Sequence, residues 1–505
     1  MSRVGCSHPK LHASFAAVTT FISMWITNTA TTALMCPIVM AILVELENQG
    51  VSKVYINRIA TGPDANLGKQ DLPDDPIPTK LTVSYFLVIA FSSTVGGTST
   101  IIGTGTNMML KGAYETLYPD SDVSFVYWMI LFLPPMIINA VLMELGLQFI
   151  FFGLWRKNSD AAKAIHIDEE TRNSIKQVIK RKYADLGPIT WHECMIISFF
   201  LLMILLFFIR HPDFMPGYVR LFNRHLNQRE QALYIRDSAA VMLLFVIMFF
   251  IPKTLDVLNF FKKRPKTLPE GSEDPLVTWK FLAGRMPWGF ILLLGSSYAL
   301  AQGSLVSGMN DYLAEKLKHL AAVPLALLLL LVLIFIKILT EFISNVAVAS
   351  ITLPILNTMS QNLQVNPLYF MLPATIVASY CFLMPVGTPP NTILRTTYHI
   401  KPRQMLKGGL WTSFITLFIT WTMFLFYSSL IYKDLLSFPR WAEIKDAENV
   451  EAFLLFVRNL IVQSRHSGGL RGEAFTINDI IYNETDYSLY ALNWGDNLSF
   501  ETSLS

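Results

Sequence analysis

The sequence has few charged residues for its length. Asp, Glu, Lys and Arg together make up 15% of the 505 residues, whereas soluble globular proteins usually carry about 25%. Hydrophobic residues account for 52% of the chain. This composition excludes an ordinary soluble enzyme or binding domain and indicates a protein that lies mainly within a lipid bilayer.

Cysteine is also scarce, and basic residues do not gather on one face. The four cysteines are scattered singly, without the Cys-x-x-Cys or His spacing of a zinc site, so we interpret them as packing residues: Cys6, Cys36, Cys194 and Cys381. The net charge is only +3, with Lys and Arg clustered in loops, which excludes a nucleic-acid partner. Residues 1–12 lack the apolar core of a signal peptide. The sequence offers no nucleophile beside a His, no metal cluster and no phosphate loop, and so predicts no enzyme activity.

Long apolar runs dominate the rest of the chain. Spanning a bilayer takes roughly 20 residues of helix, and runs near or above that length cover 81–110, 123–155, 193–209, 238–252, 287–301, 323–339, 367–394 and 408–432. The pattern predicts an all-α polytopic membrane protein. The basic segment 156–190 is expected in the cytoplasm by the positive-inside rule.

Two polar patches interrupt this apolar pattern. Ser23 to Pro37 lies inside the run 11–46, and Thr340 to Pro354 lies inside 323–360. In both patches a hydroxyl residue stands five positions before an Asn, and a Pro follows nine positions after it. We interpret both runs as re-entrant hairpins with the patch at the tip, because irregular backbone at membrane depth is tolerated only where it lines a cavity or is buried in protein.

Each predicted hairpin is followed by an apolar run that contains helix-breaking residues. The run 81–110 contains Gly103-Thr104-Gly105-Thr106-Asn107, and 367–394 contains the matching Gly387-Thr388-Pro389-Pro390-Asn391. A hairpin followed by a broken helix occurs two times in the chain, and this repetition is typical of inverted repeats with discontinuous helices. The expected layout is an incomplete first repeat (1–155, with helix 123–155), a cytoplasmic linker (156–190), a second repeat (191–432, with a last helix at 408–432) and a disordered extracellular tail (433–505).

Hydroxyls, Asn side chains and unwound backbone carbonyls are oxygen ligands suited to sodium, a hard cation. An anionic substrate between the patches would meet helix N-termini. Each single polar residue could equally be a packing contact between helices, but the pairing of two patches favours a transport site. Glu341 has two open interpretations: a proton-coupling group, or a buried carboxylate paired with backbone or with Lys337.

The patches resemble signatures of the divalent-anion/sodium symporter family, in particular the insect "I'm not dead yet" transporters. The likeness covers about residues 3–445 and rests on five motifs: Ser23 to Pro37, Ser344 to Pro354, Tyr183 to Pro188, Pro287 to Gly289 and Pro385 to Asn391. Thr27 stands where the family motif has Ser and keeps its hydroxyl. Val346 stands where the motif has Thr and loses one, which leaves carboxylate selectivity open.

The resemblance implies a homodimeric elevator-type transporter, with a scaffold and a moving transport part, in the plasma membrane. Its substrates would be succinate-, malate- or citrate-like carboxylates coupled to sodium, with no organic cofactor. It implies one sodium site at Ser23, Thr27, Asn28 and Gly103, and a second at Thr340, Ile343, Asn345 and Gly387. The residues expected to face the substrate carboxylates are Asn28, Thr29, Thr104, Ser344, Asn345, Val346, Thr388 and Pro389.

Two alternatives remain at the level of sequence. Some insect relatives are thought to exchange carboxylates without sodium. Family members also carry about three helices before the first hairpin that have no counterpart here, so a truncated, non-transporting subunit that modulates complete partners is a second expectation.

Overall fold

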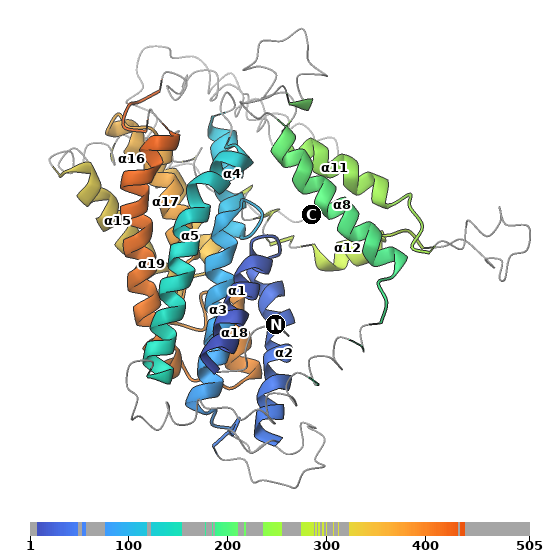
Figure 1. The fold of residues 1–505 in the computed structure, drawn as a ribbon. Coiled ribbons are helices and arrows are strands. Elements are labelled where there is room, and N and C mark those ends of the chain that lie inside the picture. Colours follow the sequence, from blue (N-terminus) through green and yellow to red (C-terminus); the bar gives the residue numbers. More distant parts are fainter. Residues whose placement is uncertain are drawn as a thin grey trace, which may run out of the picture.

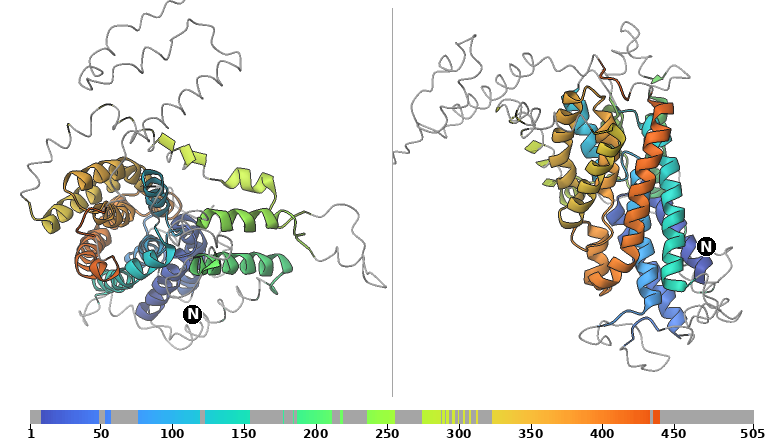
Figure 2. Two further views of the ribbon diagram at one scale, coloured as in Figure 1. Left: turned by 90° about the horizontal axis from the view of Figure 1, so that it is seen from above. Right: turned by 90° about the vertical axis from the view of Figure 1, so that its left-hand side faces the viewer.

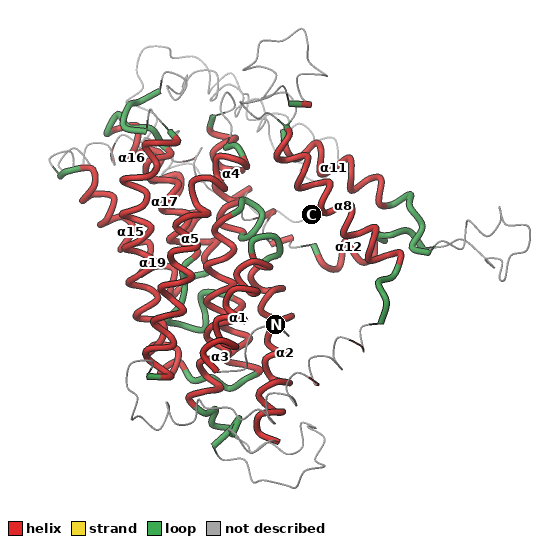
Figure 3. Tube along the Cα trace, viewed as in Figure 1, coloured by secondary structure: helices red, strands yellow, loops and turns green. Residues whose placement is uncertain are grey.

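A computed structural model describes residues 8–48, 53–56, 76–118, 123–153, 187–210, 236–254, 274–286, 323–432 and 435–439, with single positions between these segments. Every regular element among these residues is a helix (Figure 3), apart from two isolated bridges that join Tyr55 to Pro78 and Pro252 to Pro275. Much of the expected helix at 287–301, most of the 156–190 linker and most of the 433–505 tail lie outside the described residues.

The first half of the chain contains two interrupted apolar segments. Within the segment 11–46, one helix ends at Ser23 and the next begins at Asn28. Residues 24–27 connect them, and we call this connection the first turn. The segment at 81–110 is interrupted at residues 100–104, which we call the first break. The helices are α1 (His8–Ser23), α2 (Asn28–Asn48), α3 (Lys80–Gly96) with a 3-10 turn (Gly97–Ser99), α4 (Gly105–Leu117) and α5 (Phe125–Leu147) with a π-helical turn (Gln148–Phe152).

The second half repeats the order of a helix pair, a broken helix and a long helix. The second turn consists of Ile343 and Ser344, and the second break covers residues 380–388. The last helix begins at Pro402, earlier than the expected start at 408, because Pro is favoured in a first helical turn. The elements are α15 (Leu325–Phe342), α16 (Asn345–Asn362), α17 (Leu368–Ser379), α18 (Pro389–Thr397) and α19 (Pro402–Ile431).

A half-helix from each half of the chain packs against helices of the other half. The helix α3 is almost completely buried against α1, α2 and α5, and α19 lies along α5. The half-helix α4 packs on α16 and α17 of the second half, whereas α18 packs on α2 and α3 of the first. The helices of the two halves therefore form one bundle (Figures 1 and 2). The first break is largely buried in it, and the second is buried at residues 380–382, 387 and 388.

Three further helices stand beside this bundle (Figure 1): α8 (Trp191–Ile209), α11 (Asp237–Met248) and α12 (Trp279–Arg285). The side chains of α8 are apolar but almost all accessible, as expected for a helix that faces lipid. Among the described residues, six helices, α8 included, are long and apolar enough to cross a membrane. The chain is a multi-pass membrane protein.

Ion pairs attach α8 and α11 to the end of α4. The Asp237 carboxylate at the start of α11 lies 3.0 Å from the Arg210 guanidinium and 3.1 Å from the Lys111 ammonium of α4. A second pair joins Arg236 to Glu115 at 2.8 Å. Because Asp237 and Arg210 are both buried, each needs the other's charge.

Replacing Asp237 by Ala is expected to destabilise the protein. Removing one partner of a buried ion pair leaves the other charge unpaired and typically costs about 3 to 5 kcal/mol. We expect a clearly lower melting temperature in detergent, measured by intrinsic fluorescence. Asp274→Ala, at an exposed aspartate, is the matched control and should melt close to the unsubstituted protein. Equal melting temperatures for the two variants would contradict this role for Asp237.

Candidate functional site

The first turn is closed by the side chains at its two ends. The Ser23 hydroxyl lies 2.9 Å from Asn28 Oδ1 and 2.6 Å from the backbone carbonyl oxygen of Ser93 on α3. Both Ser23 and Asn28 are buried. Hydroxyl, amide and carbonyl oxygens from three helices therefore converge within hydrogen-bond distance of one another.

The second turn has the same construction. The Thr340 hydroxyl lies 2.8 Å from Asn345 Oδ1 and 2.5 Å from the carbonyl oxygen of Ala378 on α17. Asn345 also donates from Nδ2 to the carbonyl of Ser379 at 2.8 Å. The matching spacing that is visible in the sequence therefore corresponds to matching contacts in space.

An Asn side chain holds each break. Asn107 Nδ2 lies 3.2 Å from the Gly97 carbonyl oxygen and 2.7 Å from that of Thr100. Asn391 Nδ2 lies 3.1 Å from the carbonyl oxygens of both Cys381 and Met384. These carbonyls have left the helical hydrogen-bond ladder and need other donors in a buried setting. Each Asn therefore stabilises a break by bonding to residues ten and seven positions before it.

Glycine is required at both breaks because the backbone passes close to other atoms. A Cβ atom on Gly103 would lie 2.5 Å from the Gly97 carbonyl oxygen, and one on Gly387 would lie 2.5 Å from that of Thr340. Gly97 in turn lies against the Asn28 side chain. These contacts bring Gly103 to the first turn and Gly387 to the second.

The two turn-and-break units are in contact. Thr106, at the start of α4, shares a hydroxyl-to-hydroxyl hydrogen bond with Ser379, and the Ser379 carbonyl accepts from Asn345. On the other side, the Thr100 hydroxyl of the first break donates to the Met24 carbonyl of the first turn. A continuous chain of polar contacts thus runs from the first turn to the second.

Two threonines occupy equivalent positions at the ends of the breaks. Thr104 and Thr388 are the residues that precede α4 and α18, both with extended backbone and neither with a side-chain bond to its own helix. Within the described part of the chain, Thr388 Oγ1 and Asn391 Oδ1 are buried without a hydrogen-bond partner. Buried polar atoms normally have one, so these oxygens are available to a ligand.

The remaining residues expected in the site lie at its edge. Thr27, Thr29, Ile343, Ser344 and Pro389 are exposed, and Val346 is half-buried. The Ile343 amide donates to the Leu339 carbonyl, which leaves the Ile343 carbonyl at the tip of the turn. The buried part of the candidate site therefore consists of Ser23, Asn28, Gly103, Thr104, Thr340, Asn345, Gly387 and Thr388.

Comparison with known proteins identifies the family. A family model described as the sodium:sulfate symporter transmembrane region matches residues 2–433. The chain belongs to the sodium:sulfate symporter family. It is 38% identical to the protein I'm not dead yet of Drosophila melanogaster, over 87% of this chain and 74% of that one. It is 31% identical to the Na+/citrate cotransporter of Rattus norvegicus and to the Na+/dicarboxylate cotransporter 3 of Homo sapiens, over 87% of this chain and 79% and 77% of theirs.

Membership confirms the family predicted from the paired motifs. The sodium:sulfate symporters are transporters, and these relatives carry names of cotransporters or of I'm not dead yet, none of an enzyme. The prediction that the chain is not an enzyme is therefore confirmed. Its assignment as a membrane transporter follows from the family together with the apolar helices.

Sequence reasoning did not assign the two asparagines that hold the breaks. Asn107 and Asn391 each close a Gly-Thr-x-x-Asn motif, and that repetition is the signal that could have identified them. The carbonyl groups of Ser93 and Ala378 were also missed, because a backbone oxygen carries no sequence signature. These four residues complete the polar contacts of the two turns and breaks.

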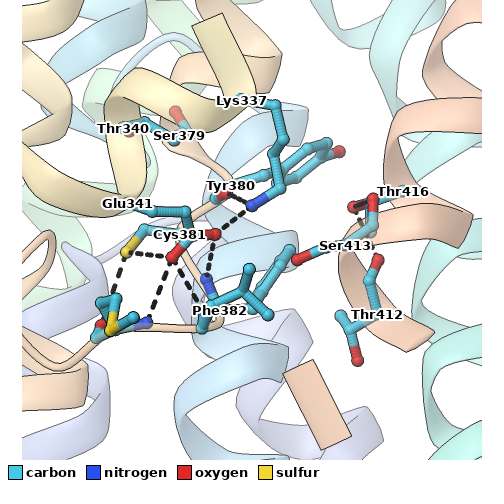
Figure 4. A network of polar contacts seen from close by, with 12 residues as sticks. Lys337, Thr340, Glu341, Ser379, Tyr380, Cys381, Phe382, Thr412, Ser413 and Thr416 are labelled. Atoms are coloured by element: carbon cyan, nitrogen blue, oxygen red, sulfur yellow. Dashed lines mark hydrogen bonds and ion pairs between the residues drawn. The ribbon is translucent and has the colours of Figure 1, made fainter. Parts of the chain in front are cut away.

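Glu341 follows Thr340 directly and lies inside a polar network (Figure 4). Its carboxylate is ion-paired with Lys337 and accepts hydrogen bonds from the backbone amides of Phe382, Leu383 and Met384 at 3.2, 2.9 and 3.2 Å. Both charged side chains are buried. Of the two interpretations of Glu341, this geometry favours the carboxylate paired with Lys337 and backbone.

Replacing Gly103 or Gly387 by Ala is expected to disrupt the breaks. The added methyl group would meet backbone carbonyl oxygens, which cannot rotate away, and such overpacking typically costs about 1 to 3 kcal/mol. Purified Gly103→Ala and Gly387→Ala should melt at lower temperature than Gly284→Ala, the control, whose Cβ meets nothing within 4 Å. If all three melt alike, the breaks are not closed as tightly as described.

Proposed function

We propose that this chain transports di- and tricarboxylates such as succinate, malate and citrate across a membrane, coupled to sodium. The single observation that carries the proposal is the duplicated site, in which Ser23 with Asn28, and Thr340 with Asn345, meet a helix break in the same way. A packing contact between helices has no need of two matching copies. The names of the citrate and dicarboxylate cotransporters among the relatives support the choice of substrate class.

Each turn with its break offers a set of oxygen ligands for one sodium ion. The first set is the Ser23 hydroxyl, Asn28 Oδ1 and backbone carbonyls of the first turn and break, including those near Thr27 and Gly103. The second is the Thr340 hydroxyl, Asn345 Oδ1 and carbonyls near Ile343 and Gly387. None of these donors is charged, so each site would bind a hard cation through dipoles alone.

The substrate would bind between the two sodium ions, against the starts of α4, α16 and α18. Free backbone amides at helix N-termini favour negative charge, and the Thr104 and Thr388 hydroxyls, which cap neither helix, would donate to a carboxylate. The side chains and backbone of Asn28, Thr29, Ser344, Asn345, Val346 and Pro389 would complete the pocket. The basic side chain of Lys337, three residues before Thr340, is already paired with Glu341.

The matching contacts of the two halves also support two inverted repeats with re-entrant hairpins, at residues 1–155 and 191–432. By the same proposal the bundle carrying both breaks would move as an elevator past a scaffold that includes α8 and α11, within a homodimer in the plasma membrane. Discontinuous helices with the binding site at the repeat interface are the usual design of such secondary transporters.

Asn28→Ala and Asn345→Ala are expected to abolish sodium-dependent carboxylate uptake. Each substitution removes a buried oxygen ligand, although the Ser23 and Thr340 hydroxyls keep their carbonyl partners on Ser93 and Ala378. A loss of about 1.4 kcal/mol already lowers sodium affinity tenfold. The measurement is uptake of labelled succinate or citrate into proteoliposomes under a sodium gradient. Asn366→Ala is the matched control, because Asn366 is a buried Asn that accepts a hydrogen bond from the Leu368 amide at the start of α17 and belongs to neither break.

Replacing external sodium by choline distinguishes coupled transport from exchange. Coupled uptake should stop in choline, whereas a sodium-independent exchanger would continue. Uptake that persists in choline and ignores both Asn substitutions would contradict the proposed sites.

Sodium and substrate should strengthen each other's binding by the same factor. Sodium at both sites would fix the two Asn carbonyls and offset substrate charge, and binding linkage is reciprocal. Isothermal titration calorimetry of citrate or succinate at a series of sodium concentrations should show the dissociation constant falling as sodium rises. The reverse titration gives the same ratio for sodium. A substrate affinity that does not vary with sodium would overturn the coupling.

A further inference from the structure

The two breaks are tied to their turns by different chemistry. The sequences of the two turns align with Ser23 at Thr340 and Asn28 at Asn345. In the same alignment Met24 stands at Glu341 and Thr20 at Lys337, so the charged pair of the second half has no charged counterpart in the first. Any role of this pair is therefore specific to the second site.

In the first half, among the residues that the structure describes, one neutral hydrogen bond joins the break to the turn. The Thr100 hydroxyl donates to the Met24 carbonyl, and the same hydroxyl accepts from the Gly103 amide at 3.1 Å. In the second half Met384 occupies the position of Thr100 and has no hydroxyl. Its backbone amide instead donates to Glu341, the residue at the position of Met24, at 3.2 Å. Equivalent residues are thus in contact in both halves, through different groups.

The charged connection is much more extensive than the neutral one. Glu341 accepts from three successive amides of the second break and from the Cys381 thiol at 3.3 Å. Lys337 donates both to Glu341 and, at 2.6 Å, to the Tyr380 carbonyl at the start of the break. Its ammonium also lies 5.4 Å from the centre of the Phe382 ring. All five residues from 380 to 384 are therefore held by one ion pair (Figure 4).

The Glu341 carboxylate is surrounded by hydrogen-bond donors. They are the Lys337 ammonium, three backbone amides and the Cys381 thiol. The ammonium and carboxylate sum to zero charge, so the pair can orient the break without adding net charge beside the Thr340 and Asn345 oxygens.

We propose that Lys337 and Glu341 form a positioning pair that presets the second sodium site by holding residues 380–384, whereas the first site has no such device and is completed by its ligands. This inference rests on the proposed sodium site at Thr340 and Asn345. The pair acts through backbone that contacts the site: the carbonyl groups of Cys381 and Met384 accept from Asn391, and Gly387 lies against both Cys381 and Thr340.

The first test measures the position of the break directly. Cys381 is completely buried inside the network, so its reaction with a small methanethiosulfonate reagent reports opening of the second break. In a chain whose Cys6, Cys36 and Cys194 are replaced by Ala, Glu341→Gln and Lys337→Met should each increase the labelling rate of Cys381 at least about tenfold. An unchanged labelling rate would overturn the positioning pair, whatever the protein transports.

A matched control separates opening of the break from general loosening of the fold. Glu144 is another buried carboxylate, bonded to His12 at 2.8 Å and to Gln148 at 2.6 Å, and it contacts neither break. Glu144→Gln should lower the melting temperature without changing the labelling of Cys381. Equal increases in labelling for Glu144→Gln and Glu341→Gln would show a structural role only and overturn the proposal.

The second test measures sodium. In proteoliposomes, Glu341→Gln should raise the sodium concentration for half-maximal succinate uptake at least about tenfold, with rates normalised to folded protein. The double variant Lys337→Met with Glu341→Gln removes both charges, so it should recover melting temperature relative to the single variants but keep the weakened sodium dependence. If the double variant recovers both the melting temperature and the sodium dependence, the pair contributes to stability alone and the proposal is wrong.

The two tests fail independently. If the unsubstituted protein shows no sodium response while Cys381 labelling still rises in Glu341→Gln, the proposed function is wrong and the pair still positions the break. If sodium dependence is present but unaffected by Glu341→Gln, the positioning pair is wrong and the proposed function stands.

Discussion

The fold depends on hydrogen-bond partners for the backbone amides and carbonyls that are released where helices break inside a membrane. A carbonyl or amide without a partner in a low-dielectric interior costs about 2 to 7 kcal/mol, and two breaks expose many such groups. The side-chain amides of Asn107 and Asn391 provide donors for four of the released carbonyl groups. Because these donors are fixed in α4 and α18, the position of each half-helix follows from the position of the break that it closes.

This requirement also explains the interleaving of the two halves. A break cannot face lipid, so each is covered by elements that bring polar atoms to it. Thr106 at the start of α4 meets Ser379 at the end of α17, and α18 packs on α2 and α3. Glycines at positions 97, 103 and 387 let these backbones approach to contact distance. The covering of the breaks and the assembly of the site are therefore the same set of interactions.

Much of this could be predicted from the sequence, and the limits have physical causes. Proline, glycine and hydroxyl residues inside apolar runs gave the positions of the turns and breaks, because they interrupt a helix locally. The matching of Ser23 with Thr340 and of Asn28 with Asn345 gave the residues that meet in space. The hydrogen-bond acceptors supplied by Ser93 and Ala378 are backbone oxygens and leave no pattern in the sequence, and the partners of Glu341 depend on tertiary packing. The ion pairs of Asp237 likewise join helices that are far apart in sequence.

The arrangement of charge is the last constraint on function. A dicarboxylate or tricarboxylate between the two turns would need positive charge nearby, yet the polar patches contain neither Lys nor Arg, and Lys337 beside the second patch is neutralised by Glu341. Helix N-termini contribute only about half a positive charge each. Two bound sodium ions would supply the remainder at the place where the neutral oxygens of Ser23, Asn28, Thr340 and Asn345 converge. By the proposed function, such a site would make the coupling ion part of the substrate's binding surface, so that coupling would follow from electrostatics.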